Sequence, residues 1–157
     1  MKAKGFTLVE ILIVVVILGI LAAIVIPQFT EASTEAKTSS LVTDLQSVRS
    51  QIQLYKIEHL DAFPGTQGPD FVTALTSYTL QDGTLAAVQE PADGVYGPYL
   101  NKMPSNPFIS DPAKANLVLE QAVDPGAPDN NTGWFFNTKT GEFKANDTYN
   151  QGAHWNL

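Results

Sequence analysis

The chain of 157 residues contains no cysteine and only two histidines, His59 and His154. The absence of cysteine excludes a disulfide framework, a thiolate metal site and a cysteine nucleophile. The sequence also lacks a Gly-rich phosphate loop, a His-Glu-x-x-His element and a Gly-x-Ser-x-Gly element. These absences give no support for an enzyme, and we expect a structural role.

Basic residues are also scarce, with 9 Lys and Arg against 16 Asp and Glu and a formal net charge of −7. An acidic chain does not suit nucleic-acid backbones, so we expect no direct nucleic-acid partner. Two of the basic residues, Lys2 and Lys4, precede a long apolar run, and the acidic residues mostly follow it. Because Lys and Arg favour the cytoplasmic end of a membrane span, the pattern predicts a cytoplasmic N-terminus and an external chain body.

The apolar run extends from Phe6 to Ile26 and carries one charged residue, Glu10. As a helix it would be about 31 Å long, enough to cross a bilayer core of about 30 Å. Pro27 ends the run and removes one backbone hydrogen bond, and Gly19 is a second weak position. We therefore predict a kink in the helix at Pro27.

Three interpretations of this segment compete. A secretory signal cleaved after the run fits poorly, because Leu21-Ala22-Ala23 places a bulky leucine at the first small position. An uncleaved single-pass anchor is compatible with the hydropathy. The third interpretation places the cleavage before the run, between Gly5 and Phe6.

The segment "KGFTLVEILIVVVILGILAAIVIP", residues 4–27, resembles the N-terminus of the type IV pilin family, which includes the pseudopilins of type II secretion. The resemblance implies that residues 1–5 are a leader peptide ending at Gly5. It implies a prepilin peptidase that cleaves after Gly5 and methylates Phe6. It also implies that Glu10 neutralises the amine of an adjacent subunit during assembly.

The chemistry of Glu10 agrees with that implied role. A carboxylate in lipid needs a cationic partner or becomes protonated. Cleavage would create an α-amine on Phe6, which is largely cationic at neutral pH. The alternative is that Glu10 stays solvated at the depth of the lipid head groups.

Residues 28–60 carry an apolar stripe spaced 4, 3, 4, 3 and 4, which predicts one face of a helix. The stripe consists of Leu41, Leu45, Val48, Ile52, Tyr55 and His59. We expect one long helix over roughly 6–60, with its apolar half, residues 6–27, in lipid or a filament core. We interpret His59 as a packed histidine with a satisfied ring nitrogen rather than a ligand.

The remaining residues, 61–157, predict a small globular head. Pro and Gly at 63–69 end the long helix, and residues 69–79 predict a short helix with Pro69 in its first turn. Residues 81–112 have the composition of a loop, and residues 118–123 could form a strand or a short helix.

Residues 133–146 give the clearest strand signal, an antiparallel hairpin around Gly141. In this hairpin Trp134 and Phe136 would share one face and Phe135 would occupy the other, because side chains alternate along a strand.

A second segment, "YGPYLNKMPSNPF" at residues 96–108, resembles the corresponding part of G-type major pseudopilins. This resemblance implies an α+β pilin fold. In that fold a long kinked N-terminal helix packs against a small C-terminal head with a short antiparallel β-sheet. We expect Tyr96, Tyr99 and Phe108 to pack against the helix stripe.

G-type pseudopilins commonly bind calcium through a C-terminal loop, which makes residues 124–133 a candidate. This segment offers Asp124, Asp129, Asn130 and Asn131, whose oxygens are of the kind that Ca²⁺ prefers. The alternative is a solvated turn rich in Asp and Asn.

The resemblance implies a homo-oligomeric helical filament whose subunits wait in the inner membrane with the head outside. Its expected partners are the prepilin peptidase, an inner-membrane assembly platform, and minor pilins or pseudopilins. Three functions stay open: the major pseudopilin of a type II secretion system, the major pilin of a surface pilus, and a membrane-anchored binding module that does not polymerise. Many pilins close their C-terminal loop with a disulfide, so the absence of cysteine favours the pseudopilin.

Overall fold

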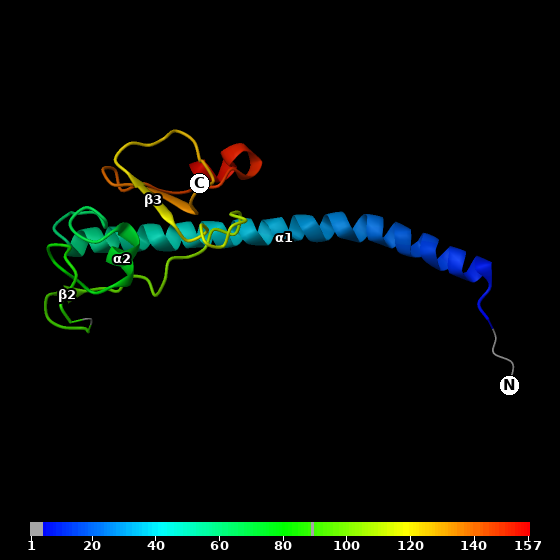
Figure 1. The fold of residues 1–157 in the computed structure, drawn as a ribbon, viewed down its shortest axis with the longest axis horizontal. Coiled ribbons are helices and arrows are strands. Elements are labelled where there is room, and N and C mark those ends of the chain that lie inside the picture. Colours follow the sequence, from blue (N-terminus) through cyan, green and yellow to red (C-terminus); the bar gives the residue numbers. More distant parts are fainter. Residues whose placement is uncertain (1–4, 89) are drawn as a thin grey trace. The chain divides into compact units, whose positions relative to one another are not determined.

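A computed structural model describes residues 5–88 and 90–157 (Figure 1). Lys2, Lys4 and most of the predicted leader therefore lie outside the described residues. The chain forms two compact units that meet between Thr38 and Ser39, and each is described by itself below.

The long predicted helix is confirmed as α1, Leu8–Glu58. It ends where Leu60 and Asp61 adopt positive φ angles of 53° and 64°. The helix continues through Gly19 and Pro27 without an unwound turn. Pro27 has no N–H to donate, and nearby the hydroxyl of Thr30 donates to the carbonyl oxygen of Ile26 at 3.0 Å. The predicted kink stays a prediction.

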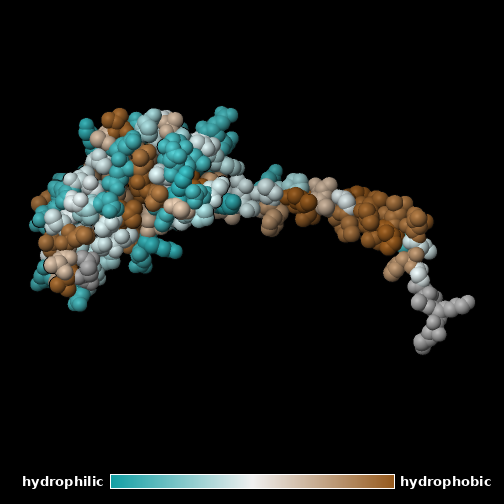
Figure 2. All heavy atoms as spheres, viewed as in Figure 1, coloured by the Kyte–Doolittle hydropathy of each residue, from teal (hydrophilic) through white to brown (hydrophobic). Residues whose placement is uncertain are grey.

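In the first unit, the apolar residues from Phe6 to Ile26 all expose their side chains. Figure 2 shows them as a continuous hydrophobic surface along this part of α1. By length and composition α1 is the one helix of the described residues that could cross a membrane. An exposed apolar surface of this size requires lipid or partner subunits to cover it.

The second unit contains the hydrophobic core, and the predicted helix stripe forms one wall of it. All six stripe residues are at most 1% exposed, which confirms the prediction. The opposite wall comes from α2 (Phe71–Thr76) and from two strands. Its fully buried side chains include Phe71, Leu75, Trp134, Phe136 and Phe143.

The main sheet has three strands in the order β3-β4-β5. Strands β4 (Trp134–Asn137) and β5 (Phe143–Ala145) form the predicted antiparallel hairpin, with Gly141 at φ 74°. Strand β3 (Val118–Gln121) resolves the ambiguity at 118–123. It pairs parallel to β4, so this sheet is mixed, and the expected antiparallel pairing is that of β4 with β5. Residues 122–133 between β3 and β4 provide the dozen residues that a parallel crossover needs.

Two local expectations also need correction. The cap of α2 is Asp70, whose carboxylate accepts the backbone N–H of Thr73 at 3.0 Å, so Pro69 precedes the helix. A carboxylate can satisfy a free helix N–H and proline cannot. Within the predicted loop, β2 (Val95–Tyr96) pairs antiparallel to β1 (Thr79–Leu80), and this second sheet was missed. The C-terminal segment, η1 (Tyr149–Asn156), contains 3₁₀ turns.

Candidate functional site

The N-terminal site begins with an exposed, non-helical stretch at Gly5 and Phe6. Phe6 is 83% exposed, and among the described residues no heavy atom beyond its chain neighbours lies within 4 Å of the position that a Cβ on Gly5 would occupy. The peptide bond between these two residues is therefore open to a peptidase. Whether it is cleaved and methylated stays a prediction.

Thr7 and Glu10 form a reciprocal cap at the start of α1. The carboxylate of Glu10 accepts the backbone N–H and the hydroxyl of Thr7, both at 2.8 Å. In return the backbone N–H of Glu10 donates to the hydroxyl oxygen of Thr7 at 3.2 Å. This is the capping box, which stabilises the first turn of a helix. The Thr-x-x-Glu spacing is visible in the sequence, and sequence reasoning missed it.

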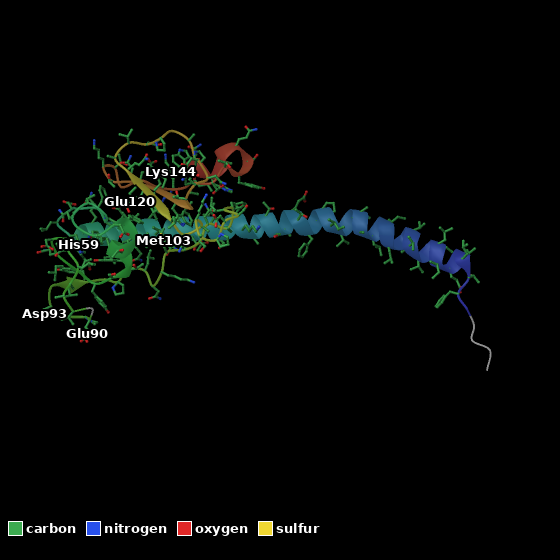
Figure 3. All side chains as sticks on the ribbon, in the orientation of Figure 1. His59, Glu90, Asp93, Met103, Glu120 and Lys144 are labelled. Atoms are coloured by element: carbon green, nitrogen blue, oxygen red, sulfur yellow. The ribbon has the colours of Figure 1, made fainter. Side chains whose placement is uncertain are left out.

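At the other end of α1, His59 is packed as expected (Figure 3). Its Nδ1 lies 2.8 Å from the carbonyl oxygen of Tyr55 and its Nε2 lies 2.9 Å from the hydroxyl of Thr79. A carbonyl can only accept, so Nδ1 carries the proton and Nε2 accepts from Thr79. Burial lowers the pKa of His59 and keeps the ring neutral, although nearby acceptors and the Glu58 charge oppose the shift.

The predicted tyrosine packing is confirmed around this histidine. The ring of Tyr55 stacks on His59 with centroids 3.7 Å apart. Tyr96 meets the edge of the His59 ring, and Tyr99 packs against Tyr55 and donates its hydroxyl to Glu58. Phe108 also packs against the core, and its ring contacts those of Tyr149 and His154.

The candidate calcium residues have protein partners of their own. Asp124 forms an ion pair with Lys144 at 2.8 Å. The two carboxylate oxygens of Asp129 accept hydrogen bonds from Asn131 and from the side chain of Asn146. Asn130 takes a positive φ of 61°, which is the geometry of a tight turn.

The electrostatics of this loop follow from the same contacts. The hydrogen bond from Lys144 lowers the pKa of Asp124. Burial alone would lower the pKa of Lys144, but Asp124 and Glu142 raise it overall. Among the described residues no group of three or more His, Cys, Asp or Glu side chains could hold a metal ion. The carboxylates of Asp124 and Asp129 thus have protein partners in this conformation, and the calcium hypothesis stays a prediction that a binding measurement tests.

A buried polar network joins the C-terminal segment to the head, and sequence reasoning missed it. Asp147 is fully buried, and its carboxylate contacts Nδ1 of His154 at 2.8 Å. Its other oxygen accepts the side-chain amide of Asn106 at 2.9 Å. That amide also donates to the carbonyl oxygen of Gly133 at 2.9 Å. Asn106 lies 27 residues before Gly133 and 41 before Asp147 in the chain, and no local pattern signals these contacts.

Two comparisons with known proteins bear on this chain. The prokaryotic N-terminal methylation motif matches residues 1–26 and includes Gly5, Phe6 and Glu10. Type II secretion system core protein G of Klebsiella pneumoniae is 32% identical over 112 residues, which cover 70% of this chain and 72% of that protein. The core protein G of Vibrio cholerae serotype O1 is 33% identical over 112 residues, 70% of this chain and 68% of that protein. The chain belongs to the core protein G family.

Other core protein G relatives match over a smaller share of their length. The relative from Pectobacterium carotovorum is 32% identical over 110 residues, 65% of that protein. The relative from Pseudomonas aeruginosa is 42% identical over 66 residues, 46% of that protein. The chain therefore spans less than two thirds of these two core protein G sequences. No solved structure matches the chain.

Proposed function

We propose that the chain is the major pseudopilin of a type II secretion system, a structural subunit that polymerises into a helical filament and drives protein export. The observation that carries this proposal is the apolar half of α1, which is exposed along its whole length and begins at a motif for N-terminal processing. The core protein G relatives support the assignment to secretion.

The exposed apolar half of α1 would occupy two environments in turn, first the membrane and then the filament. The precursor would sit in the inner membrane as a single span with the head outside. Transfer into a filament then exchanges lipid for the same half-helices of neighbouring subunits. Both environments are apolar, so the transfer changes the partners of the span more than its solvation.

Processing would supply a positively charged partner for the carboxylate of Glu10. In the described chain Glu10 is held by neutral donors from Thr7. Cleavage after Gly5 would place an α-amine on Phe6, and the amine of an adjacent subunit would then pair with Glu10 and set the axial register. The partners required for this pathway are a prepilin peptidase, an assembly platform in the inner membrane, and minor pseudopilins.

The mass of the native N-terminus distinguishes this function from a membrane anchor that never polymerises. We expect the protein purified from its own membranes to lack Met1–Gly5 and to carry a methyl group on Phe6. An intact Met1 would contradict the proposal. Intact-mass spectrometry with sequencing of the first peptide measures both features at once.

Immunogold electron microscopy separates the pseudopilus from a surface pilus. With native expression and an antibody to the head, we expect label confined to the cell envelope. Long labelled surface fibres would instead identify a pilus subunit for adhesion, motility or DNA uptake.

A further inference from the structure

The head contains two Asp-Gly pairs, Asp82-Gly83 and Asp93-Gly94. In such a pair the backbone nitrogen of glycine can attack the side-chain carboxyl carbon of aspartate, because no Cβ on glycine obstructs the approach. The new bond closes a five-membered succinimide ring, and one carboxyl oxygen leaves as water. This reaction requires a free carboxyl group, a free glycine N–H and a backbone that can bring the two reacting atoms together. The two pairs differ in all three requirements.

The Asp82-Gly83 pair is held by the turn that follows β1. The carboxylate of Asp82 accepts the backbone N–H and the hydroxyl of Thr84, at 3.0 and 2.6 Å. Gly83 is buried, and its N–H donates to the carbonyl oxygen of Leu80 at 2.8 Å. The hydrogen bonds from Thr84 also lower the pKa of Asp82, which disfavours the protonated carboxyl group that releases water on ring closure. Both reacting groups are thus already bound, and ring closure must first break these hydrogen bonds.

The Asp93-Gly94 pair lies in an exposed turn just before β2 (Figure 3). The N–H of Val95 donates to the carbonyl oxygen of Ala92 at 3.0 Å, so Asp93 and Gly94 are the two central residues of a four-residue turn. Gly94 has a φ of 76°. Within the described part of the chain, no heavy atom beyond its chain neighbours lies within 4 Å of the position of a Cβ on Gly94.

The reacting groups of this second pair are also free of hydrogen bonds. Among the described residues, none donates to the carboxylate of Asp93 and none accepts the N–H of Gly94. Exposed loops are more mobile than the elements they connect, so the turn can sample the geometry of attack. All three requirements are therefore met at Asp93.

We propose that Asp93 is a modification site at which the head forms isoaspartate without an enzyme. The nitrogen of Gly94 bonds to Cγ of Asp93 and one water leaves. A second water then cleaves the bond between this nitrogen and the main-chain carbonyl carbon of Asp93. The nitrogen stays bonded to Cγ, and the former main-chain carbonyl becomes a free carboxylate. One water is released and one is consumed, so the reaction is an isomerisation that needs no oxidant, reductant or cofactor.

The product changes the chain next to β2. The backbone then runs through the side chain of residue 93 and gains one methylene group between Ala92 and Val95, which disturbs the hydrogen bond that closes the turn. Val95 pairs with Leu80 in the small sheet, so β2 should loosen, whereas the buried stripe of α1 should stay packed. The freed carboxylate is the group that isoaspartate methyltransferases esterify with S-adenosylmethionine, so an enzyme of this class is the partner that the modified site would take.

The test is ageing of the full chain in detergent at neutral pH. Isoaspartate is measured at both pairs by chromatography and fragmentation of the peptides, and in the whole chain by methyl transfer from labelled S-adenosylmethionine with a purified isoaspartate methyltransferase. We expect about tenfold or more isoaspartate at Asp93 than at Asp82, because ring closure at Asp82 must first break its hydrogen bonds. Equal amounts at the two pairs would overturn the inference.

A matched variant and an unfolded sample complete the test. Asp93→Glu keeps the charge but would have to close a six-membered ring, so we expect it to lose most of the methyl transfer; a wild-type level would overturn the inference. In urea the two pairs should react within about threefold of each other, because the contacts that protect Asp82 are lost. A preference for Asp93 that persists unchanged in urea would show that the fold does not select the site. Either failure would leave the proposed function intact, because Asp93 lies outside the processing segment and the apolar half of α1.

Discussion

The carboxylate of Glu10 accepts hydrogen bonds from the backbone N–H and from the hydroxyl of Thr7, each at 2.8 Å. Both residues lie at the start of the same helix. In the precursor this pair caps α1 from within one chain. In the proposed filament the carboxylate must instead meet the amine of a neighbour. Under the proposed function Glu10 would therefore have two separable roles, as a helix cap and as the charged partner of a neighbour's amine.

Substitution of Glu10 separates these roles. Glu10→Gln keeps the capping geometry, because glutamine also serves at this position of a capping box, but it removes the charge. We expect Glu10→Gln and Glu10→Ala to be inserted and processed normally and to form no filaments. Electron microscopy and N-terminal mass check the two steps. Filaments from Glu10→Gln would show that the cap alone matters, and filaments from Glu10→Ala would contradict any role in assembly.

His59 predicts a pH dependence of stability. Its folded-state pKa is lowered, so the native head holds a neutral ring, whereas the unfolded chain takes up a proton below a pKa of about 6.5. The stabilising contribution is therefore present above about pH 6.5 and is lost as the pH falls, with a slope of at most about 1.4 kcal/mol per pH unit.

Chemical unfolding of the full chain in detergent measures this effect through Trp134 and Trp155, which both lie in the head. We expect His59→Gln to have a shallower dependence between pH 7.5 and 5.5 than wild type. His154→Gln is the control and should retain the slope due to His59. An unchanged slope in His59→Gln would refute the assignment.

Removal of the buried carboxylate of Asp147 should destabilise the head strongly. In Asp147→Ala the side chains of Asn106 and His154 lose their shared partner. Leaving buried polar groups without their partner in this way costs about 1–3 kcal/mol for each group. Glu90→Ala, at an exposed position, should stay within about 0.5 kcal/mol of wild type in the same unfolding assay. A loss below about 1 kcal/mol for Asp147→Ala would mean that the network is not important for folding.

Calcium should leave the melting temperature of the head unchanged. The carboxylate of Asp124 forms an ion pair with Lys144, and the carboxylate of Asp129 accepts hydrogen bonds from the side chains of Asn131 and Asn146. A ligand that binds only the native state must raise the melting temperature. Melts in calcium and in chelator therefore decide the question. An increase in calcium that disappears in Asp129→Ala would contradict this expectation and restore the calcium hypothesis.

Periodic and local features of the fold were predictable from the sequence. The helix stripe from Leu41 to His59 and the hairpin around Gly141 depend on spacing and turn chemistry within short segments, and both are confirmed. Features that depend on distant residues were not predictable. The parallel pairing of β3 with β4 and the contact of Asn106 with Asp147 are set by tertiary packing, which leaves no mark on either segment alone.

The candidate site shows the same division. The processing segment could be identified from residues 4–27, because its residues are contiguous. The hydrogen bond between His59 and Thr79 could not be identified in this way, because the two residues are 20 positions apart in the chain.

The most direct test of a role in secretion compares the proteins in the culture medium before and after deletion of the gene. We predict that specific proteins accumulate inside the cell envelope in the deletion strain. Expression of the wild-type chain should restore their export, and the Glu10→Ala chain at equal level should not. An unchanged set of exported proteins in the deletion strain would contradict the proposed function.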